Sequence, residues 1–583
     1  MAKAKQIGRL RKLIMKRPIS SLHFLLFFVT LLQFFPLRLP ADPVQARHGM
    51  VVSSQPLASQ VGVEILKAGG NAVDAAVATG FALAVVHPTA GNIGGGGFMV
   101  IRFPDGSATC IDYREKAPAK ADRDMYLKPD GTVDAQKSRQ GILAVGVPGS
   151  VAGLCYAVQK YGSLPLAKVL QPAIELAEKG FPVTAGQARD FQALREDFAR
   201  YPCTAKVFLK PDGSAYQQGE NFRQPDLAET LKRIARSGAQ AFYTGAIADL
   251  IVQEMKRHDG LITKEDLLNF RAVERRPIRG TFREYQIISM PPPSSGGIVL
   301  VEMLNILQPM QLRSLGHNSA AYVHLLAEAM RSAFADRAKY LGDPDFVAIP
   351  VAGLLSKSYA ATLREDIPRQ RARNSLALHN PDPTLFTHES EETTHYSVVD
   401  EKGMAVSVTT TLNGGYGSLI VVDGAGFLLN NEMDDFTARP GVPNMYGLVQ
   451  GQANAIEPNK RMLSSMTPTI ITRDDRLYMV IGSPGGPTII NTVLQIFLNA
   501  AIFDMDIEQA ISAPRFHHQW LPDRISYERD GFSPDVIEEL ERMGHHLAGR
   551  RRIGEAEGIL YHASGQYYSG YADKRGEGGA VGY

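Results

Sequence analysis

Thr393 lies where a polar, cuttable stretch gives way to a strand-like run, within residues 391–400. If the chain is cut before Thr393, the threonine hydroxyl gains a base, because the new α-amino group belongs to the same residue. An α-amine has a pKa of roughly 7.7–8.0, so a useful fraction is neutral near physiological pH and can accept the hydroxyl proton. The segment predicts an N-terminal threonine nucleophile, and the alternative is a threonine that only belongs to a strand.

A second strand-like run at residues 404–413 follows the short loop 401–403, which ends in glycine, and predicts a hairpin. A three-residue loop pairs Asp400 with Met404 and places Thr393 opposite Thr411. A second hydroxyl then lies beside the nucleophile. A two-residue loop shifts the pairing by one position.

Residues 428–436 crowd amides and carboxylates against apolar residues, and we expect them at the end of a strand. The acids of this segment, Glu432, Asp434 and Asp435, could bind an ammonium group there, and the alternative is a solvated turn. Ser464 and Ser465 place two hydroxyl donors before a predicted strand at residues 469–472. Alone, the serine pair indicates little.

Gly485 and Gly486 precede Pro487 and the apolar, helix-like run 488–503. Pro487 fits a first helical position, so the two glycine N–H groups are expected at a helix N-terminus, unshielded by side chains. Such a pair can form an oxyanion hole. A phosphate-binding turn is the competing interpretation, but the run lacks the spacing and the lysine of a nucleotide loop.

Together the segments at 393–397, 411–413, 430–435, 464–465 and 482–486 resemble the γ-glutamyltranspeptidases (γ-glutamyltransferases). The resemblance keeps the same order upstream, at residues 91–99, 112–118 and 291–297. It covers nearly everything after residue 46. It implies an N-terminal-nucleophile hydrolase that is made as one precursor and cuts itself at Glu392–Thr393.

The resemblance also implies a role for each matching position. Thr393 is the nucleophile, Thr411 supports it, Gly485 and Gly486 hold the oxyanion, Arg114 with Ser464 and Ser465 binds the substrate α-carboxylate, and Asn413, Glu432 and Asp435 hold its α-ammonium. This chemistry is consistent, because a guanidinium fork matches a carboxylate while acids and an amide oxygen suit an ammonium group. Some relatives have Gln at position 432, and either residue accepts a hydrogen bond.

Residues 439–460 match the lid over the glutamyl pocket that some relatives lack, and Tyr446 is the expected gate residue. A closed lid would limit the access of water and select acceptors. Other relatives are acylases that lose parts of the amino-acid clamp. The clamp is intact here, which favours γ-glutamyl substrates.

Helix-like runs dominate before the predicted cut, and strand-like alternation dominates after it. The helix-like runs are residues 58–67, 151–160, 166–178, 226–237 and 321–340. Neither piece can bury a core alone, so both should share one sheet sandwich. The resemblance names this α+β fold as the four-layer αββα sandwich, processed into two interleaved subunits, 47–392 and 393–583, with 371–392 as the loop released at its tail.

The first 46 residues combine a basic stretch, the apolar run 22–37 and a small-residue site at Val44-Gln45-Ala46. They are predicted to be a signal peptide, with a signal-anchor as the alternative. Their removal changes the formal charge from +2 to −5, because they hold eight Lys or Arg and one Asp. We expect an exported enzyme, periplasmic or extracellular or else membrane-anchored, without nucleic-acid partners.

No metal or cofactor site is expected. Cys110, Cys155 and Cys203 cannot all pair within the chain. Adjacent His517 and His518 would face opposite sides of a strand, which makes them poor joint ligands. Gly94 to Gly97 lack the spaced glycines and the acidic residue of a dinucleotide site, so close backbone packing is the better interpretation.

The expected reaction is γ-glutamyl transfer from glutathione and similar γ-glutamyl compounds to water, amino acids or dipeptides, by a heterodimer of the two subunits. A periplasmic amino-acid-binding protein is one alternative, and it would run as a single intact polypeptide on a denaturing gel. An acylase of the same fold is another, and a substrate panel separates it from a glutamyl enzyme.

Overall fold

The structure is a computed structural model that describes residues 43–378 and 393–583. The predicted basic and apolar N-terminal segment lies outside these residues, and so do Glu392 and the tail of the predicted loop 371–392. Within the two described ranges, no helix is both long enough and apolar enough to cross a bilayer.

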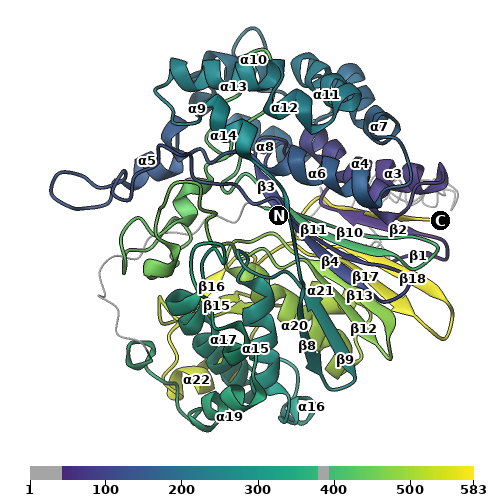
Figure 1. The fold of residues 1–583 in the computed structure, drawn as a ribbon. Helices are drawn as coiled ribbons and strands as arrows, with labels where there is room; N and C mark the ends of the chain where they lie inside the picture. Colours follow the sequence, from purple (N-terminus) through teal and green to yellow (C-terminus); the bar gives the residue numbers. More distant parts are fainter. Residues whose placement is uncertain (1–42, 379–392) are drawn as a thin grey trace, which may run out of the picture. The chain divides into compact units, whose positions relative to one another are not determined.

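Two seven-stranded sheets form the centre of the fold (Figure 1). The first, here called the nucleophile sheet, has the order β19 (Gly579–Gly582), β2 (Met50–Ser53), β10 (Thr394–Val399), β11 (Ala405–Thr411), β3 (Gly96–Arg102), β4 (Ala108–Asp112) and β7 (Val273–Arg275). The second sheet has the order β1 (Val44–Ala46), β18 (Tyr567–Ala572), β17 (Glu557–His562), β13 (Arg476–Gly482), β12 (Thr469–Arg473), β9 (Tyr285–Ser289) and β8 (Ile278–Phe282). All pairings within these two sheets are antiparallel.

Side-chain alternation along the strands divides the core into layers. In β10, Tyr396 and Val398 pack into the core under the first helices, whereas Val399 belongs to the core between the sheets. Ile470 of β12 faces this core between the sheets, while Ile471 faces a third core under the second set of helices. The order is helices, sheet, sheet, helices, as Figure 1 shows. The predicted four-layer αββα sandwich is confirmed.

The outer layers hold nearly all the helices. Over the nucleophile sheet lie α3 (Pro56–Lys67), α4 (Ala72–Val86), α6 (Ser150–Tyr161), α7 (Leu166–Lys179), α8 (Ala185–Ala193), α9 (Arg195–Ala199), α10 (Pro202–Phe208), α11 (Pro225–Ser237), α12 (Ala239–Tyr243), α13 (Ala246–Arg257) and α14 (Lys264–Asn269). Under the second sheet lie α15 (Gly296–Leu307), α16 (Leu312–Leu315), α17 (Ala320–Tyr340), α18 (Val351–Leu354), α19 (Lys357–Glu365), α20 (Thr488–Phe503), α21 (Ile507–Ser512) and α22 (Pro534–Arg542), with the small sheet β14 (Phe516–His517), β15 (Ile525–Glu528) and β16 (Leu547–Arg550). All five helix-like runs are helices within two residues of their predicted bounds.

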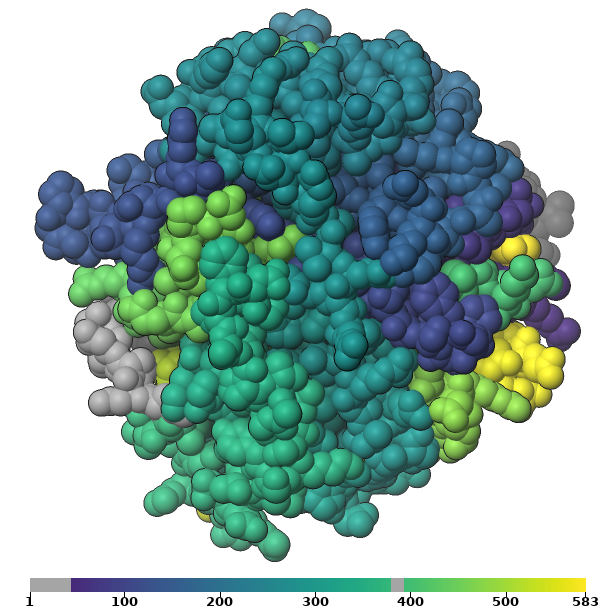
Figure 2. All heavy atoms as spheres, in the orientation of Figure 1, coloured from purple at the N-terminus to yellow at the C-terminus, as the bar shows by residue number. Residues whose placement is uncertain are grey.

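The two parts of the chain are interleaved. In the nucleophile sheet, β10 and β11 lie between β2 and β3, which come from before residue 379, and β19 closes the same sheet. In the second sheet, β1 pairs with β18 and β9 pairs with β12. The space-filling view shows both parts on one continuous face (Figure 2). The prediction that neither piece builds its own core is confirmed.

Three local predictions need correction. Residues 428–436 do not end a strand: Leu428 makes a single β-bridge, and Glu432–Asp435 is a buried 3-10 helix, η3. Pro487 is the N-cap of α20 rather than its first helical residue. Strands β1 to β9 all precede Thr393, so the first part of the chain supplies more sheet than its helix-rich pattern indicated.

Candidate active site

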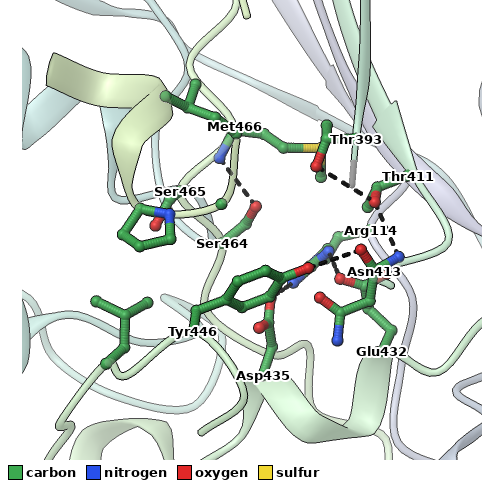
Figure 3. A pocket seen from close by; sticks show the side chains of 14 residues that line it. Arg114, Thr393, Thr411, Asn413, Glu432, Asp435, Tyr446, Ser464, Ser465 and Met466 are labelled. Atoms are coloured by element: carbon green, nitrogen blue, oxygen red, sulfur yellow. Dashed lines mark hydrogen bonds and ion pairs between the residues drawn. The ribbon is translucent and has the colours of Figure 1, made fainter. Parts of the chain in front are cut away.

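One pocket of about 300 Å³ gathers almost every predicted site residue at the C-terminal end of β11 (Figure 3). It is lined by Arg114, Thr393, Thr411, Asn413, Glu432, Asp435, Tyr446, Leu448, Ser464, Ser465, Met466, Gly486, Pro487 and Ile489. Of the predicted residues, only Gly485 is not part of this lining. Residues far apart in the sequence meet here because four parts of the chain converge: β11, η3, the segment that holds Ser464 and Ser465 (here called the 460s segment), and the start of α20.

The hairpin places Thr393 beside Thr411, as the three-residue loop predicted. Thr394 pairs with Thr410, and the Asp400 N–H donates to the Met404 carbonyl, so the register puts Thr393 opposite Thr411. The Thr393 hydroxyl donates to Thr411 Oγ1 at 3.5 Å. Thr411 Oγ1 also accepts from the Asn413 backbone N–H at 2.8 Å. Two donors thus orient the Thr411 lone pairs, and the nucleophile side chain is 7% exposed.

Asn413 has a left-handed backbone, with φ of 78°, at the turn that follows β11. Its side-chain nitrogen donates to the Asn431 carbonyl at 3.0 Å. Among the described residues its amide oxygen has no hydrogen-bond donor, and this oxygen suits an ammonium group in the pocket.

Arg114 is fully buried and already shared between two acids (Figure 3). Its Nη1 donates to Glu432 and its Nη2 to Asp435, while Nε donates to the Met462 carbonyl at 3.2 Å. Burial alone would lower the pKa of Arg114, but Glu432, Asp435 and Glu115 raise it. Burial raises the pKa of Glu432 well above its usual range against the attraction of Arg114, and the pKa of Asp435 is raised for the same reason.

Glu115 is a member of this cluster to which the sequence pointed only as the neighbour of Arg114. It is fully buried, and its carboxylate lies 3.6 Å from Arg114 Nη1. Burial raises the pKa of Glu115 to about 7, and Arg114 opposes the increase. A Cβ on Gly96 would stand 2.4 Å from this carboxylate, so the glycine run at Gly94–Gly97 serves close packing, as predicted.

Ser464 and Ser465 are held from behind by Ser295 and Arg337. The Ser295 N–H and hydroxyl both donate to the Ser464 carbonyl, at 2.8 and 2.7 Å. Arg337 Nη2 donates to Ser465 Oγ at 3.2 Å. No pattern in the sequence indicated Arg337, which lies in the last turn of the helix α17.

Gly485 and Gly486 form a turn of positive φ, 128° and 53°, directly before α20. Among the described residues neither backbone N–H has an acceptor, and the N-terminus of a helix favours negative charge. A Cβ on Gly486 would stand 2.8 Å from the Tyr446 ring. Glycine is therefore required at position 486 by both φ and space.

Tyr446 lines the pocket, and in Figure 3 its ring lies next to Arg114 and Asp435. Its hydroxyl donates to the Asn413 carbonyl at 2.6 Å, and its side chain is buried. Asn444 Nδ2 donates to Asp435 Oδ1 at 3.2 Å, and the Met445 N–H donates to Asp434 at 2.8 Å. The predicted lid segment is therefore tied directly to η3.

His395, two residues beyond the nucleophile, does not line the pocket. Its nitrogens contact the Thr409 and Ser397 hydroxyls at 2.9 and 3.1 Å. Burial lowers the pKa of His395 to about 3, so the ring is neutral, and a Cβ on Gly482 would clash with it. It fills the space between the sheets.

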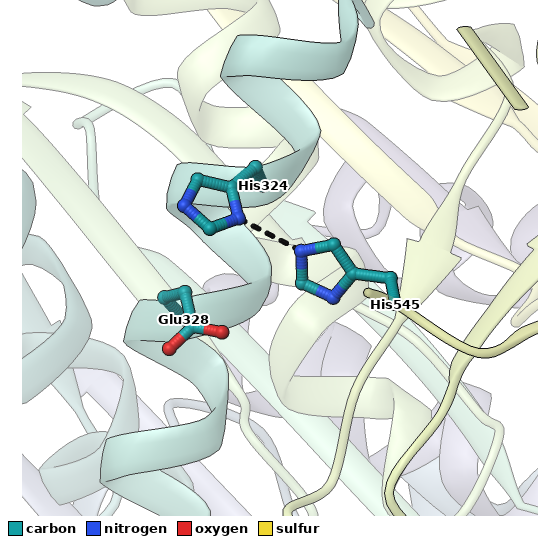
Figure 4. Close-up of side chains that lie close together, drawn as sticks. All are labelled: His324, Glu328 and His545. Atoms are coloured by element: carbon teal, nitrogen blue, oxygen red, sulfur yellow. Dashed lines mark hydrogen bonds between the residues drawn. The ribbon is translucent and has the colours of Figure 1, made fainter. Parts of the chain in front are cut away.

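His517 and His518 contact different partners, Asn491 and Asp523, as their predicted structural role requires. A group that the sequence did not indicate is His324, Glu328 and His545, all buried (Figure 4). His324 Nδ1 lies 2.8 Å from His545 Nε2, and its Nε2 lies 2.7 Å from the Pro368 carbonyl. Arg331 and Arg373 both pair with Glu328, so its charge is already compensated. A cation would meet two guanidinium groups, and the arrangement favours a structural role.

The model of the family "Gamma-glutamyltranspeptidase" matches residues 58–583. The chain belongs to the γ-glutamyltranspeptidase family.

Two groups of proteins illustrate the match to this family. A glutathione hydrolase proenzyme of Escherichia coli strain K12 is 50% identical over 533 residues, which cover 91% of each chain. Among solved structures, cephalosporin acylase from Bacillus halodurans has a TM-score of 0.82 at 29% identity, over 94% of this chain and 98% of that one. Helicobacter pylori γ-glutamyltranspeptidase is 48% identical with a TM-score of 0.54, over 55% of this chain and 92% of that one.

As a γ-glutamyltranspeptidase, the chain is an N-terminal-nucleophile hydrolase, and the fold and the enzyme class expected from its motifs are confirmed. Self-cleavage fits the same family, because its curated relatives are proenzymes. The individual roles expected of the pocket residues remain predictions.

Proposed function

We propose that this γ-glutamyltranspeptidase cuts itself before Thr393 and then transfers γ-glutamyl groups from glutathione and similar donors to water, amino acids or dipeptides. The arrangement of Thr393 above a buried guanidinium flanked by two carboxylates carries this proposal. A γ-glutamyl group offers an amide to the hydroxyl and an α-amino acid head to the charged end of the pocket.

In self-cleavage, the Thr393 oxygen attacks the Glu392 carbonyl carbon, and the peptide C–N bond breaks as an ester forms. The Thr393 amine is freed as the C–N bond breaks, and water then hydrolyses the ester, which frees the Thr393 hydroxyl and the Glu392 carboxylate. Thr411 Oγ1 accepts the hydroxyl proton's hydrogen bond and fixes the direction of attack. No free amine exists at this stage, so another base must take the proton.

In the mature enzyme, the Thr393 amine accepts the hydroxyl proton and the oxygen attacks the γ-carbonyl carbon. The tetrahedral intermediate carries its negative charge on the former carbonyl oxygen, where the N–H groups of Gly485 and Gly486 before α20 stabilise it. The C–N bond breaks, the amine leaves with a proton, and a γ-glutamyl ester remains. Water or an acceptor amine then attacks this ester and restores Thr393.

The α-carboxylate and the α-ammonium of the donor are proposed to bind to different sets of residues in the pocket. Ser464, Ser465 and Arg114 take the α-carboxylate, while Asn413, Glu432 and Asp435 take the α-ammonium. Arg114 already contacts both acids, so a bound ammonium competes with it and frees N–H donors for the carboxylate.

A bulky-amide acylase is the second candidate, because a cephalosporin acylase shares the fold. The buried clamp and the closed Tyr446 lid favour the small zwitterionic head. A panel of γ-glutamyl and glutaryl amides decides between them: this enzyme should cleave the γ-glutamyl series with the higher kcat/KM.

Processing is proposed to give subunits of residues 47–392 and 393–583 that stay together as a heterodimer, in an exported enzyme. The proposed signal cut after Ala46 would remove β1, which pairs with β18 at an edge of the second sheet. Intact mass of the purified protein determines both cuts.

Thr393→Ala tests the nucleophile. We expect an uncut precursor without activity, whereas Thr393→Ser should be processed slowly because it keeps the hydroxyl and loses the restraint on χ1. A small subunit of 191 residues from the Ala variant, or no glutamyl adduct on Thr393 after trapping of the wild type, would contradict the proposal.

A further inference from the structure

Arg337 is a second buried guanidinium. It lies behind Ser465, at the side of the pocket that is proposed to bind the donor α-carboxylate. It lies in α17, is 2% exposed, and does not line the pocket itself. Its three donor groups each have one acceptor: Nε contacts Ser295 Oγ at 2.9 Å, Nη1 contacts Gln450 Oε1 at 3.2 Å and Nη2 contacts Ser465 Oγ at 3.2 Å. All three acceptors are neutral.

No described carboxylate forms an ion pair with Arg337, which is unusual for a buried guanidinium. Burial lowers its pKa to about 10, Asp435 opposes this at longer range and Arg114 adds to it, so the group remains charged at neutral pH. A buried charge with only neutral partners is costly unless an anion arrives nearby. The side chain it holds, Ser465, is proposed to bind the donor carboxylate.

The charges of the occupied site support the same conclusion. An ammonium group bound between Glu432 and Asp435 favours the ionised form of both acids. With Glu115 protonated, as its raised pKa of about 7 allows, these two acids and Arg114 carry a net charge of −1. A γ-glutamyl head is a neutral zwitterion and does not change this sum. Arg337 brings the site to neutrality from the side where the donor carboxylate lies.

Arg337 also connects the two serines that are proposed to bind the donor carboxylate with the predicted lid segment 439–460. Gln450 belongs to the lid segment 439–460, and its Nε2 donates to the Asp435 carbonyl at 3.0 Å. Ser295 Oγ, which accepts from Arg337, donates to the Ser464 carbonyl. The Arg337 side chain therefore holds Ser465 directly, Ser464 through Ser295, and Gln450 of the lid segment.

We propose that Arg337 is a positioning residue of the donor site: it orients Ser465 and supplies the positive charge that makes a donor α-carboxylate acceptable. This inference rests on the proposed γ-glutamyl function. It predicts that Arg337 determines the preference for donors with an α-carboxylate over donors without one.

The test compares two donors that differ only in this group, γ-glutamyl-p-nitroanilide and 4-aminobutanoyl-p-nitroanilide, on the processed enzyme. In Arg337→Gln, we expect kcat/KM for the γ-glutamyl donor to fall 30-fold or more, mainly through KM. The site without Arg337 still binds the ammonium group, so kcat/KM for the 4-aminobutanoyl donor, which has no α-carboxylate, should change less than threefold. The ratio of the two values should thus shift at least tenfold.

Arg331→Gln is a matched control, because it also removes a buried guanidinium from α17, but one that pairs with Glu328 and Asp523 away from the pocket. It should lower Tm and leave the donor ratio unchanged. Arg337→Lys keeps the charge without the fork, so it should recover part of the preference and shift the ratio about threefold.

A donor ratio within threefold of wild type in Arg337→Gln would overturn the proposal, whatever happens to the rates, because a purely structural role lowers both donors alike. If Arg337→Gln does not mature, an unchanged ratio and KM in Arg337→Lys would overturn it. A wild type that does not distinguish the donors would instead contradict the proposed glutamyl clamp itself.

Discussion

At the scale of single residues, the shared guanidinium of Arg114 is the feature that most directly limits the donor. Arg114→Ala would leave Glu432 and Asp435 buried without a cation and the donor carboxylate without a fork. Loss of one partner of a buried charge pair costs roughly 2–5 kcal/mol. We expect kcat/KM for γ-glutamyl-p-nitroanilide to fall by roughly tens- to thousands-fold. Normal self-cleavage and near-normal kinetics together would contradict the assignment, and Arg114→Lys controls for charge alone.

Glu115 gives the molecule a measurable pH dependence of stability. Burial raises its pKa from 4.5 to about 7, so the folded state keeps a proton that the unfolded chain has lost. Its stabilising contribution is present below pH 4.5 and is lost as the pH rises through about 7. Relative to Glu115→Gln, the Tm of the wild type should fall over this interval. Glu432 and Asp435 interact with Glu115, so the pH dependence belongs to the three carboxyl groups together. Parallel curves of Tm against pH for the wild type and Glu115→Gln would contradict the expectation.

The sequence indicated the residues of the pocket unevenly. Thr393 could be predicted from the polar stretch and the strand pattern around it, whereas the acids near 432 and the two serines were assigned to the pocket through the family resemblance. Arg337 and Ser295 could not, because their partners are reached only when α17 and the start of α15 pack against the 460s segment. A buried arginine within a helix has no local pattern that separates it from an exposed one.

At the scale of elements, the β10–β11 hairpin and its three-residue loop were predicted correctly, against the alternative of a two-residue loop, and the acid segment was not. A three-residue loop fixes the hairpin register, and every side chain follows by period 2. Residues 428–436 are instead an irregular segment that contains the 3-10 helix η3 (Glu432–Asp435). It is held by long-range contacts such as Asn430 Nδ2 to the Gly94 carbonyl at 2.9 Å. Period and propensity cannot reveal such contacts.

Deletion of the predicted lid segment would change two features of the site at once. Tyr446 lines the pocket and donates to the Asn413 carbonyl, whereas Gln450 and Asn454 both donate to the Asp435 carbonyl. Point variants of Tyr446 therefore test the lid more sharply than removal of residues 439–460.

Tyr446→Ala should widen the donor range and raise the share of hydrolysis over transfer, because the ring no longer excludes water. Tyr446→Phe keeps the ring over Gly486 and loses only the hydrogen bond to the Asn413 carbonyl, so its effect should be smaller. The measurement is the partition of the glutamyl ester between water and a dipeptide acceptor. The same partition in wild type and Tyr446→Ala would show that Tyr446 is no gate.

At the scale of the whole molecule, the four layers are shared between the two products of self-cleavage. The helix and strand periods predicted a joint sandwich, and both sheets do combine strands from before and after Thr393. The order of the strands could not be predicted from periodicity, because a strand pattern does not identify its neighbours. The family resemblance supplied the architecture.

This interleaving predicts that cleavage does not release the small subunit. Alone, residues 393–583 would lose β2 and β3 beside the β10–β11 hairpin and β9 beside β12, which leaves open sheet edges and an uncovered core. We expect the two processed subunits to co-elute in native size-exclusion chromatography and to separate only in denaturant. Residues 393–583 expressed alone should be insoluble or lack a cooperative unfolding transition, whereas co-expression with residues 47–392 should restore part of the activity. A soluble, cooperatively folded small subunit would contradict the shared core, since each of its sheets depends on strands from the other part of the chain.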